Sequence, residues 1–114
     1  MTAIKIGQHY FDLSNESDFE SIQLLFSKSI TYRSGSGELF IGVPDIIAMQ
    51  RQYHGSFESL LWQVNTTNEI KPGIIQLDFS FSGISKSAEK VSYSGLETII
   101  IYQGKIQHID VYRR

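Results

Sequence analysis

The chain has 114 residues, of which 41% are hydrophobic and 19% are charged, and it contains no cysteine. A chain of this length folds around about one core, so we expect a single domain over residues 1–114. Lys and Arg total 10 against 12 Asp and Glu, and the net charge of -2 argues against a broad basic surface for nucleic acid or anionic lipid. The lack of cysteine excludes disulfides and thiolate metal sites.

The N-terminal segment lacks the charged start and the apolar core that are typical of a signal peptide. No apolar run approaches the ~20 residues that a membrane-spanning helix needs. We therefore expect a cytoplasmic protein that contacts neither membrane nor nucleic acid.

Apolar residues at helical spacing predict two helices between Ile4 and Lys28, separated by the polar cluster at 14–17. Asn15 or Ser17 is the predicted cap of the second helix. A third helix is predicted from Pro44 to about 53, because proline favours the first turn of a helix. The buried side of the second helix would be formed by Phe19, Ile22, Leu25 and Phe26.

Residues 29–33 and 38–41 predict a short hairpin, and four more strands are predicted at about 57–66, 74–82, 91–102 and 105–113. The strand at 74–82 alternates strictly between apolar and polar residues, as a half-buried antiparallel strand does. Helices that precede strands indicate an α+β fold, with the helices packed on one face of an antiparallel sheet.

A two-residue turn at Gln103 and Gly104 would place Glu97 opposite Asp110 on the last two strands. The same register puts His108 and Tyr112 on the face of Glu97. Two carboxylates whose β-carbons are about 5 Å apart in a pocket repel, so one of them would hold its proton or find a cationic partner, and such a pair could act in acid/base chemistry. The alternative is a wet rim of the sheet, where His108 neutralises one acid.

The order of the elements resembles the nuclear transport factor two-like superfamily, which includes ketosteroid isomerases and SnoaL-like polyketide cyclases. The resemblance covers nearly the whole chain. It is carried by Leu25-Phe26, Phe40-x-Gly42, Gly95-x-Glu97 and Gly104-Lys105-Ile106. It implies a cone in which a curved sheet wraps around three helices in the N-terminal half and encloses a pocket, and commonly a homodimer through the outer sheet face.

The same resemblance implies that Glu97 is the pocket acid and that Tyr10 is a donor to an oxyanion. The proton-shuttling aspartate of the isomerases corresponds to Ser34, which is a poor base, so steroid isomerase activity is not expected. Taken alone, Tyr10 could equally be a core tyrosine whose hydroxyl is satisfied by a neighbouring acid.

The predicted catalytic residues are thus Glu97, Asp110 and Tyr10, and the predicted pocket residues are Trp62, His108, Tyr112 and Phe26. Trp62 could be either core or a flat pocket wall, with core favoured. The three histidines lack the spacing of zinc ligands, and the glycine-serine stretch at 34–37 reads as a turn and not as a phosphate loop, so we expect no metal and no cofactor.

Two functions remain open at this point. One is an isomerase, cyclase or hydrolase that acts on a small hydrophobic substrate by acid/base chemistry. The other is a binding or interaction module of the same fold. We also expect a homodimer, because the outer face of the last hairpin would carry the apolar side chains of Leu96, Ile100, Tyr102, Ile109 and Val111.

Overall fold

The computed structural model describes residues 1–114. Its helices are α1 (Ala3–Asn15), α2 (Phe19–Leu24) and α3 (Val43–Gly55). Its strands are β1 (Phe26–Arg33), β2 (Leu39–Ile41), β3 (Phe57–Lys71), β4 (Ile74–Ser85), β5 (Lys90–Tyr102) and β6 (Lys105–Arg113). Element order and fold class therefore agree with the prediction from sequence. None of the helices is long and apolar enough to cross a membrane, and a cytoplasmic location stays a prediction.

The second helix is shorter than predicted, because pairing with another strand takes over its last residues. The amide of Ile106 donates to the carbonyl of Leu25 at 2.8 Å, and Phe26 already pairs with β6. The predicted cap is also wrong, since the side chain of Asp18 accepts from the amide of Ser21. Asn15 has another role, described below.

The third helix begins as predicted. Gly42 is its cap residue, with a φ of 88°, a conformation that favours glycine, and Pro44 lies in its first turn. The helix buries Ile46, Ile47 and Gln50. Gln50 is thus a polar side chain on the buried side of α3, where it lines the cavity.

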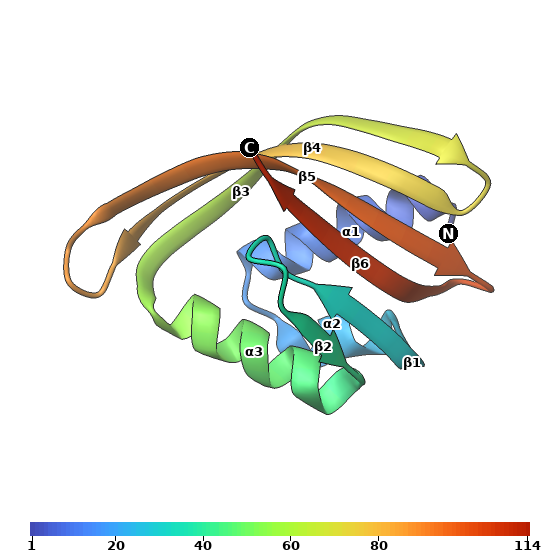
Figure 1. Ribbon diagram of the computed structural model, residues 1–114, viewed down its shortest axis with the longest axis horizontal. Coiled ribbons are helices and arrows are strands. Elements are labelled where there is room, and N and C mark those ends of the chain that lie inside the picture. Colours follow the sequence, from blue (N-terminus) through green and yellow to red (C-terminus); the bar gives the residue numbers. More distant parts are fainter.

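All six strands form one sheet in the order β2-β1-β6-β5-β4-β3. Its pairings are antiparallel except that β1 and β6 run parallel, so the expected fully antiparallel sheet is a mixed one. The chain passes through α3 and four strands before β6 returns beside β1, so no hairpin fixes the direction of this pair. Figure 1 shows β3 to β6 arching over the helices, with α3 opposite the crest of the sheet.

The hairpin of β5 and β6 has the predicted turn but not the predicted register. Gln103 and Gly104 have positive φ and Tyr102 pairs with Lys105, as expected for a two-residue turn. A bulge at Gln107 then shifts the pairing, so that Ile100 faces His108 and Glu97 faces Val111. Because one extra residue reverses the side-chain alternation, β6 beyond Gln107 presents the opposite faces from those predicted.

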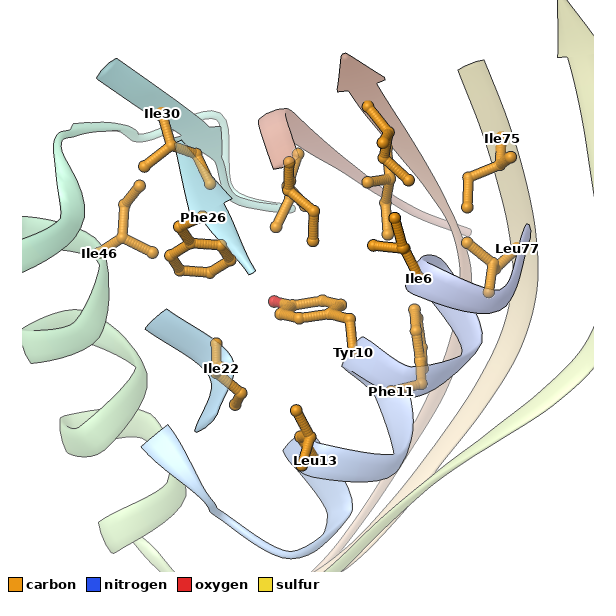
Figure 2. Close-up of a cluster of buried hydrophobic side chains, with 14 of the residues drawn as sticks. Ile6, Tyr10, Phe11, Leu13, Ile22, Phe26, Ile30, Ile46, Ile75 and Leu77 are labelled. Atoms are coloured by element: carbon orange, nitrogen blue, oxygen red, sulfur yellow. The ribbon is translucent and has the colours of Figure 1, made fainter. Parts of the chain in front are cut away.

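The core lies between the concave face of the sheet and the helices. Eighteen hydrophobic residues form one buried cluster, and Phe79, Phe81 and Ile99 supply its sheet side. In Figure 2, Tyr10 extends from α1 toward Phe26 on β1, across the middle of this cluster. The core side chains do not fill all of the space between the helices and the sheet, and a cavity remains beside Tyr10 and Phe79.

Candidate functional site

A cavity of about 290 Å³ lies between the concave sheet face, α1, α3 and the loop that joins β1 to β2. Its deep end is formed by buried residues, and its mouth by the exposed residues of the loop and the end of β6. The residues that line it are Tyr10, Phe11, Ser14, Tyr32, Ser34, Gly35, Ser36, Glu38, Phe40, Met49, Gln50, Tyr53, His54, Trp62, Phe79, Tyr93, Glu97, Val111 and Arg113. Eight of these 19 residues are Phe, Tyr or Trp, and their flat rings suit a flat apolar molecule.

Glu97 is the only carboxylic acid at the deep end of the cavity. It sits on the concave face of β5 between Leu77 and Val111, and only 5% of its surface is exposed. It makes no ion pair. Burial raises its pKa from 4.5 to about 8, because the charged form loses its hydration in this apolar surrounding. Near neutral pH the side chain is therefore mostly protonated, with the ionised form within reach.

Asp110 is not the partner of Glu97. The bulge at Gln107 places Asp110 opposite Thr98 on the convex face, where it lies 3.8 Å from Arg33. The predicted pair of carboxyl groups is therefore wrong, and burial alone shifts the pKa of Glu97.

His108 and Tyr112 also lie on the convex face, and neither lines the cavity. His108 forms a hydrogen bond of 2.6 Å with the hydroxyl of Thr31, and 65% of Tyr112 is exposed. Their predicted place in the pocket is wrong for the same reason as that of Asp110.

Tyr10 reaches the cavity from α1, as the resemblance implied. Its hydroxyl oxygen accepts a hydrogen bond of 2.8 Å from the side-chain amide of Gln50. Burial, together with the negative charge of nearby Glu97, holds the pKa of Tyr10 well above its usual value. The phenol therefore stays protonated and keeps a proton to donate.

Gln50 is a buried residue of the cavity wall that was not predicted from the sequence. It is 5% exposed, and its Oε1 atom has no hydrogen-bond partner although it is fully buried. A buried acceptor without a partner costs about 1–3 kcal/mol, so such atoms are rare outside functional sites. The sequence held a clue, because Gln50 follows Ile46 and Ile47 at helical spacing on the apolar side of α3.

Trp62 is a wall of the cavity and not a core residue. Its side chain is half-buried, and its ring packs 4.9 Å from that of Phe81 and 5.0 Å from that of His54. Asn15 fixes its backbone, because its amide group accepts from the Trp62 amide at 2.7 Å and donates to the Trp62 carbonyl at 2.9 Å. Phe26, by contrast, is buried behind Tyr10 and does not line the cavity, so its predicted pocket role is wrong.

The mouth carries a second polar group of residues. The hydroxyls of Tyr53 and Tyr93 form a hydrogen bond of 2.8 Å, and the guanidinium carbon of Arg113 lies 3.7 Å from the centre of the Tyr93 ring. His54, also on the cavity wall, packs against Trp62, and burial lowers its pKa to about 4, so it is neutral at physiological pH. No three His, Asp or Glu side chains come together as a set that could hold a metal ion.

No family model and no curated protein sequence matches the chain. Its structure is similar to that of an NTF2-like protein of unknown function from Exiguobacterium, with 17% identity, a TM-score of 0.86 and coverage of 96% of this chain and 98% of that one. It is also similar to an LEH-like epoxide hydrolase from M. tuberculosis, with 12% identity, a TM-score of 0.85 and coverage of 98% and 82%.

A third similar structure is a candidate SnoaL-like polyketide cyclase from Shewanella putrefaciens, with 7% identity, a TM-score of 0.87 and coverage of 97% and 88%. These likenesses span nearly the whole chain at low identity, so they concern the arrangement of the backbone. The chain therefore has the cone fold of the nuclear transport factor two-like proteins.

Proposed function

We propose that the protein binds a small, mainly apolar molecule in the cavity and transfers a proton to or from it through Glu97. The observation that carries this proposal is a carboxyl group buried in a cavity without a cationic partner, with a pKa raised to about 8. A general acid or base works best when its pKa is near the operating pH. Cavity residues with strongly perturbed pKa values are the usual candidates for such work.

Tyr10 supplies the second element of the proposed chemistry. Because its oxygen already accepts from Gln50, its own proton is free for an oxygen atom of the ligand. Removing a proton next to a carbonyl builds negative charge on the carbonyl oxygen, and a fixed donor stabilises that charge. Glu97 and Tyr10 together suit an isomerase, cyclase or hydrolase, and two of the similar structures are a candidate cyclase and an epoxide hydrolase.

A binding module without catalysis is the second candidate. It is favoured by the presence of only one carboxylic acid at the deep end, since the other acid of the cavity wall, Glu38, is exposed on the loop between β1 and β2. The two candidates differ in whether the protein accelerates proton exchange on a bound ketone.

We expect the wild-type protein to speed the exchange of α-protons of tetralone for deuterium, followed by NMR in heavy water. The rate should rise with pH through about 8 as Glu97 ionises. Glu97→Gln should lower it by at least about 100-fold, and Tyr10→Phe by about tenfold or more. Asp110→Asn, on the other face of the sheet, is the matched control and should not change it. Exchange no faster than in buffer, together with calorimetric binding of tetralone, would favour the binding module.

We also propose a homodimer through the convex sheet face, in which the bulge at Gln107 changes the residues that form the interface from those expected from the sequence. Ile109 and Val111 turn inward at the bulge, whereas Tyr102 and Tyr112 are each 65% exposed on the convex side, beside Ile100. We expect light scattering at micromolar concentration to give twice the monomer mass, and Ile100→Lys to halve it, because a charge would be buried in the interface. A monomeric wild-type protein would contradict this proposal.

A further inference from the structure

Arg113 differs from its neighbouring arginines in having no carboxylate partner. Arg33 is 3.8 Å from Asp110, and Arg114 is 2.6 Å from Asp78. Arg113, between them in the fold, makes no ion pair and lines the mouth of the cavity. Its charge is therefore not neutralised within the protein.

The side chain of Arg113 is nevertheless held in place from two sides. Its guanidinium group lies 3.7 Å above the ring of Tyr93. Its aliphatic stem packs under the loop between β1 and β2 at Gly35, where an added Cβ would lie 2.9 Å from Cγ of Arg113. Figure 1 shows this loop rising toward the C-terminal end of β6. A guanidinium held in this way loses little freedom when it binds a ligand.

Stacking on Tyr93 uses the face of the guanidinium, and the N–H groups that do not reach the hydroxyls of Tyr53 and Tyr93 stay available for a ligand. The N–H edge of a guanidinium matches the two oxygens of a carboxylate. The hydroxyls of Tyr53 and Tyr93 lie beside it and can take part in binding. Of the other titratable groups along the wall, His54 is neutral, Glu38 is on the rim without an ion pair, and burial holds the pKa of Tyr10 and Tyr32 well above the usual value, so both are uncharged. Glu97 is buried, four residues further along β5 than Tyr93, over which Arg113 lies.

The opposite end of the cavity disfavours an anion and favours a neutral polar group. Glu97 would repel a second carboxylate whenever it is ionised, and the unpartnered Oε1 of Gln50 can only accept a hydrogen bond. An anionic ligand would therefore lie with its charge at the mouth. The cavity volume of about 290 Å³ is just below the range of roughly 300–1,000 Å³ that is usual for ligand pockets, which favours a small ligand of one or two rings.

We infer that the ligand is a small aromatic or other flat apolar carboxylate, whose carboxylate binds Arg113 at the mouth and whose polar group at the other end meets Tyr10 and Gln50. This inference rests on the proposed function and names the substrate class of the same site. It makes Arg113 a residue that sets specificity and leaves proton transfer to Glu97.

The test is calorimetric titration with naphthoate and with its neutral counterpart naphthamide. The wild-type protein should bind naphthoate at least about tenfold more tightly, because a charge-assisted pair replaces a neutral contact. Arg113→Gln should abolish that preference and leave the affinity for naphthamide within about threefold of wild type. Arg114→Gln is the matched control, since Arg114 is already paired with Asp78 and lies outside the cavity wall. It should leave both affinities unchanged.

Glu38→Gln gives a second variant at an exposed position that is easily tolerated, and it should strengthen naphthoate binding by removing the other charge of the rim. Equal affinity of the wild-type protein for both probes, or an unchanged preference in folded Arg113→Gln, would overturn the inference and leave the ligand pocket standing. Binding of neither probe would overturn it together with the proposed function. Circular dichroism of each variant verifies folding.

Discussion

Replacing Glu97 with glutamine is expected to remove a pH dependence of stability that the wild-type protein shows between pH 4.5 and about pH 8. In the unfolded chain the carboxyl loses its proton near pH 4.5, whereas in the folded protein burial keeps it protonated to about pH 8. Between these two pH values the Glu97 carboxyl is ionised in the unfolded chain and protonated in the folded protein. A rise in pH therefore lowers the free energy of the unfolded state and not that of the folded state. The free energy of unfolding is therefore highest, as far as Glu97 contributes, below pH 4.5, and this contribution is lost as the pH rises to about 8.

The expected loss is on the order of 5 kcal/mol across this range, which is a large part of the roughly 5–15 kcal/mol that is typical of a domain. Urea denaturation at a series of pH values measures it. Glu97→Gln should lack this loss and should exceed the wild-type protein in stability at pH 8, while the two should be similar at pH 4.5.

Asp110→Asn is the control for this experiment as well, because it removes a carboxyl group from the same hairpin on the convex face. It should leave the fall in stability with pH in place. If wild type and Glu97→Gln show parallel profiles, Glu97 is ionised at neutral pH in the folded protein. The proposed proton transfer would then lose its main support.

Much of the fold was predictable because each local pattern agreed with the final structure. Strict alternation from Ile75 to Phe81 gave β4 its buried face, and Pro44 marked the start of α3. The second helix failed at its end, where the strand pairing of Phe26 outweighed helical periodicity. Periodicity within a short stretch of sequence cannot show this competition, because the pairing strand β6 lies far along the chain.

About half of the candidate site was predicted, and one bulge accounts for three of the wrong assignments, those of Asp110, His108 and Tyr112. Glu97 and Tyr10 do line the cavity, but a bulge at Gln107 moved Asp110 to the other face. The sequence contains a trace of this bulge. Ile106 and Ile109 are three residues apart and both fully buried, so they cannot share one face of a regular strand without an extra residue between them.

Arg113 and Gln50 were not predicted as site residues, because their roles follow from the partners that their side chains lack in the folded protein. An arginine near a C-terminus usually lies in solvent, and a glutamine on a helix usually faces outward. Only the structure shows that Arg113 has no acid beside it and that Oε1 of Gln50 has no donor. Unsatisfied groups of this kind are what a ligand completes.

Gly95→Ala is expected to have the second large effect, a loss of about 3 kcal/mol in the free energy of unfolding, as overpacking of a tight core produces. Gly95 lies on the concave face of β5, two residues before Glu97, and is buried. An added Cβ would lie 2.8 Å from Cζ of Phe79 and would also collide with the backbone carbonyl of Tyr112. The Tyr112 carbonyl belongs to the backbone of the neighbouring strand and cannot turn away, so β5 and β6 must separate, and the Phe79 ring must shift toward the cavity that it lines.

Gly55→Ala is the matched control, because a Cβ there meets no atom within 4 Å. It should be neutral or stabilising by up to about 1 kcal/mol, since alanine restricts the unfolded chain. Urea denaturation of the two variants compares them directly. A Gly95→Ala protein within about 0.5 kcal/mol of wild type would show that the hairpin yields easily at this point. If the predicted loss occurs, the close approach of Gly95 to the Tyr112 carbonyl holds β5 against β6, the two strands that carry Glu97 and Arg113.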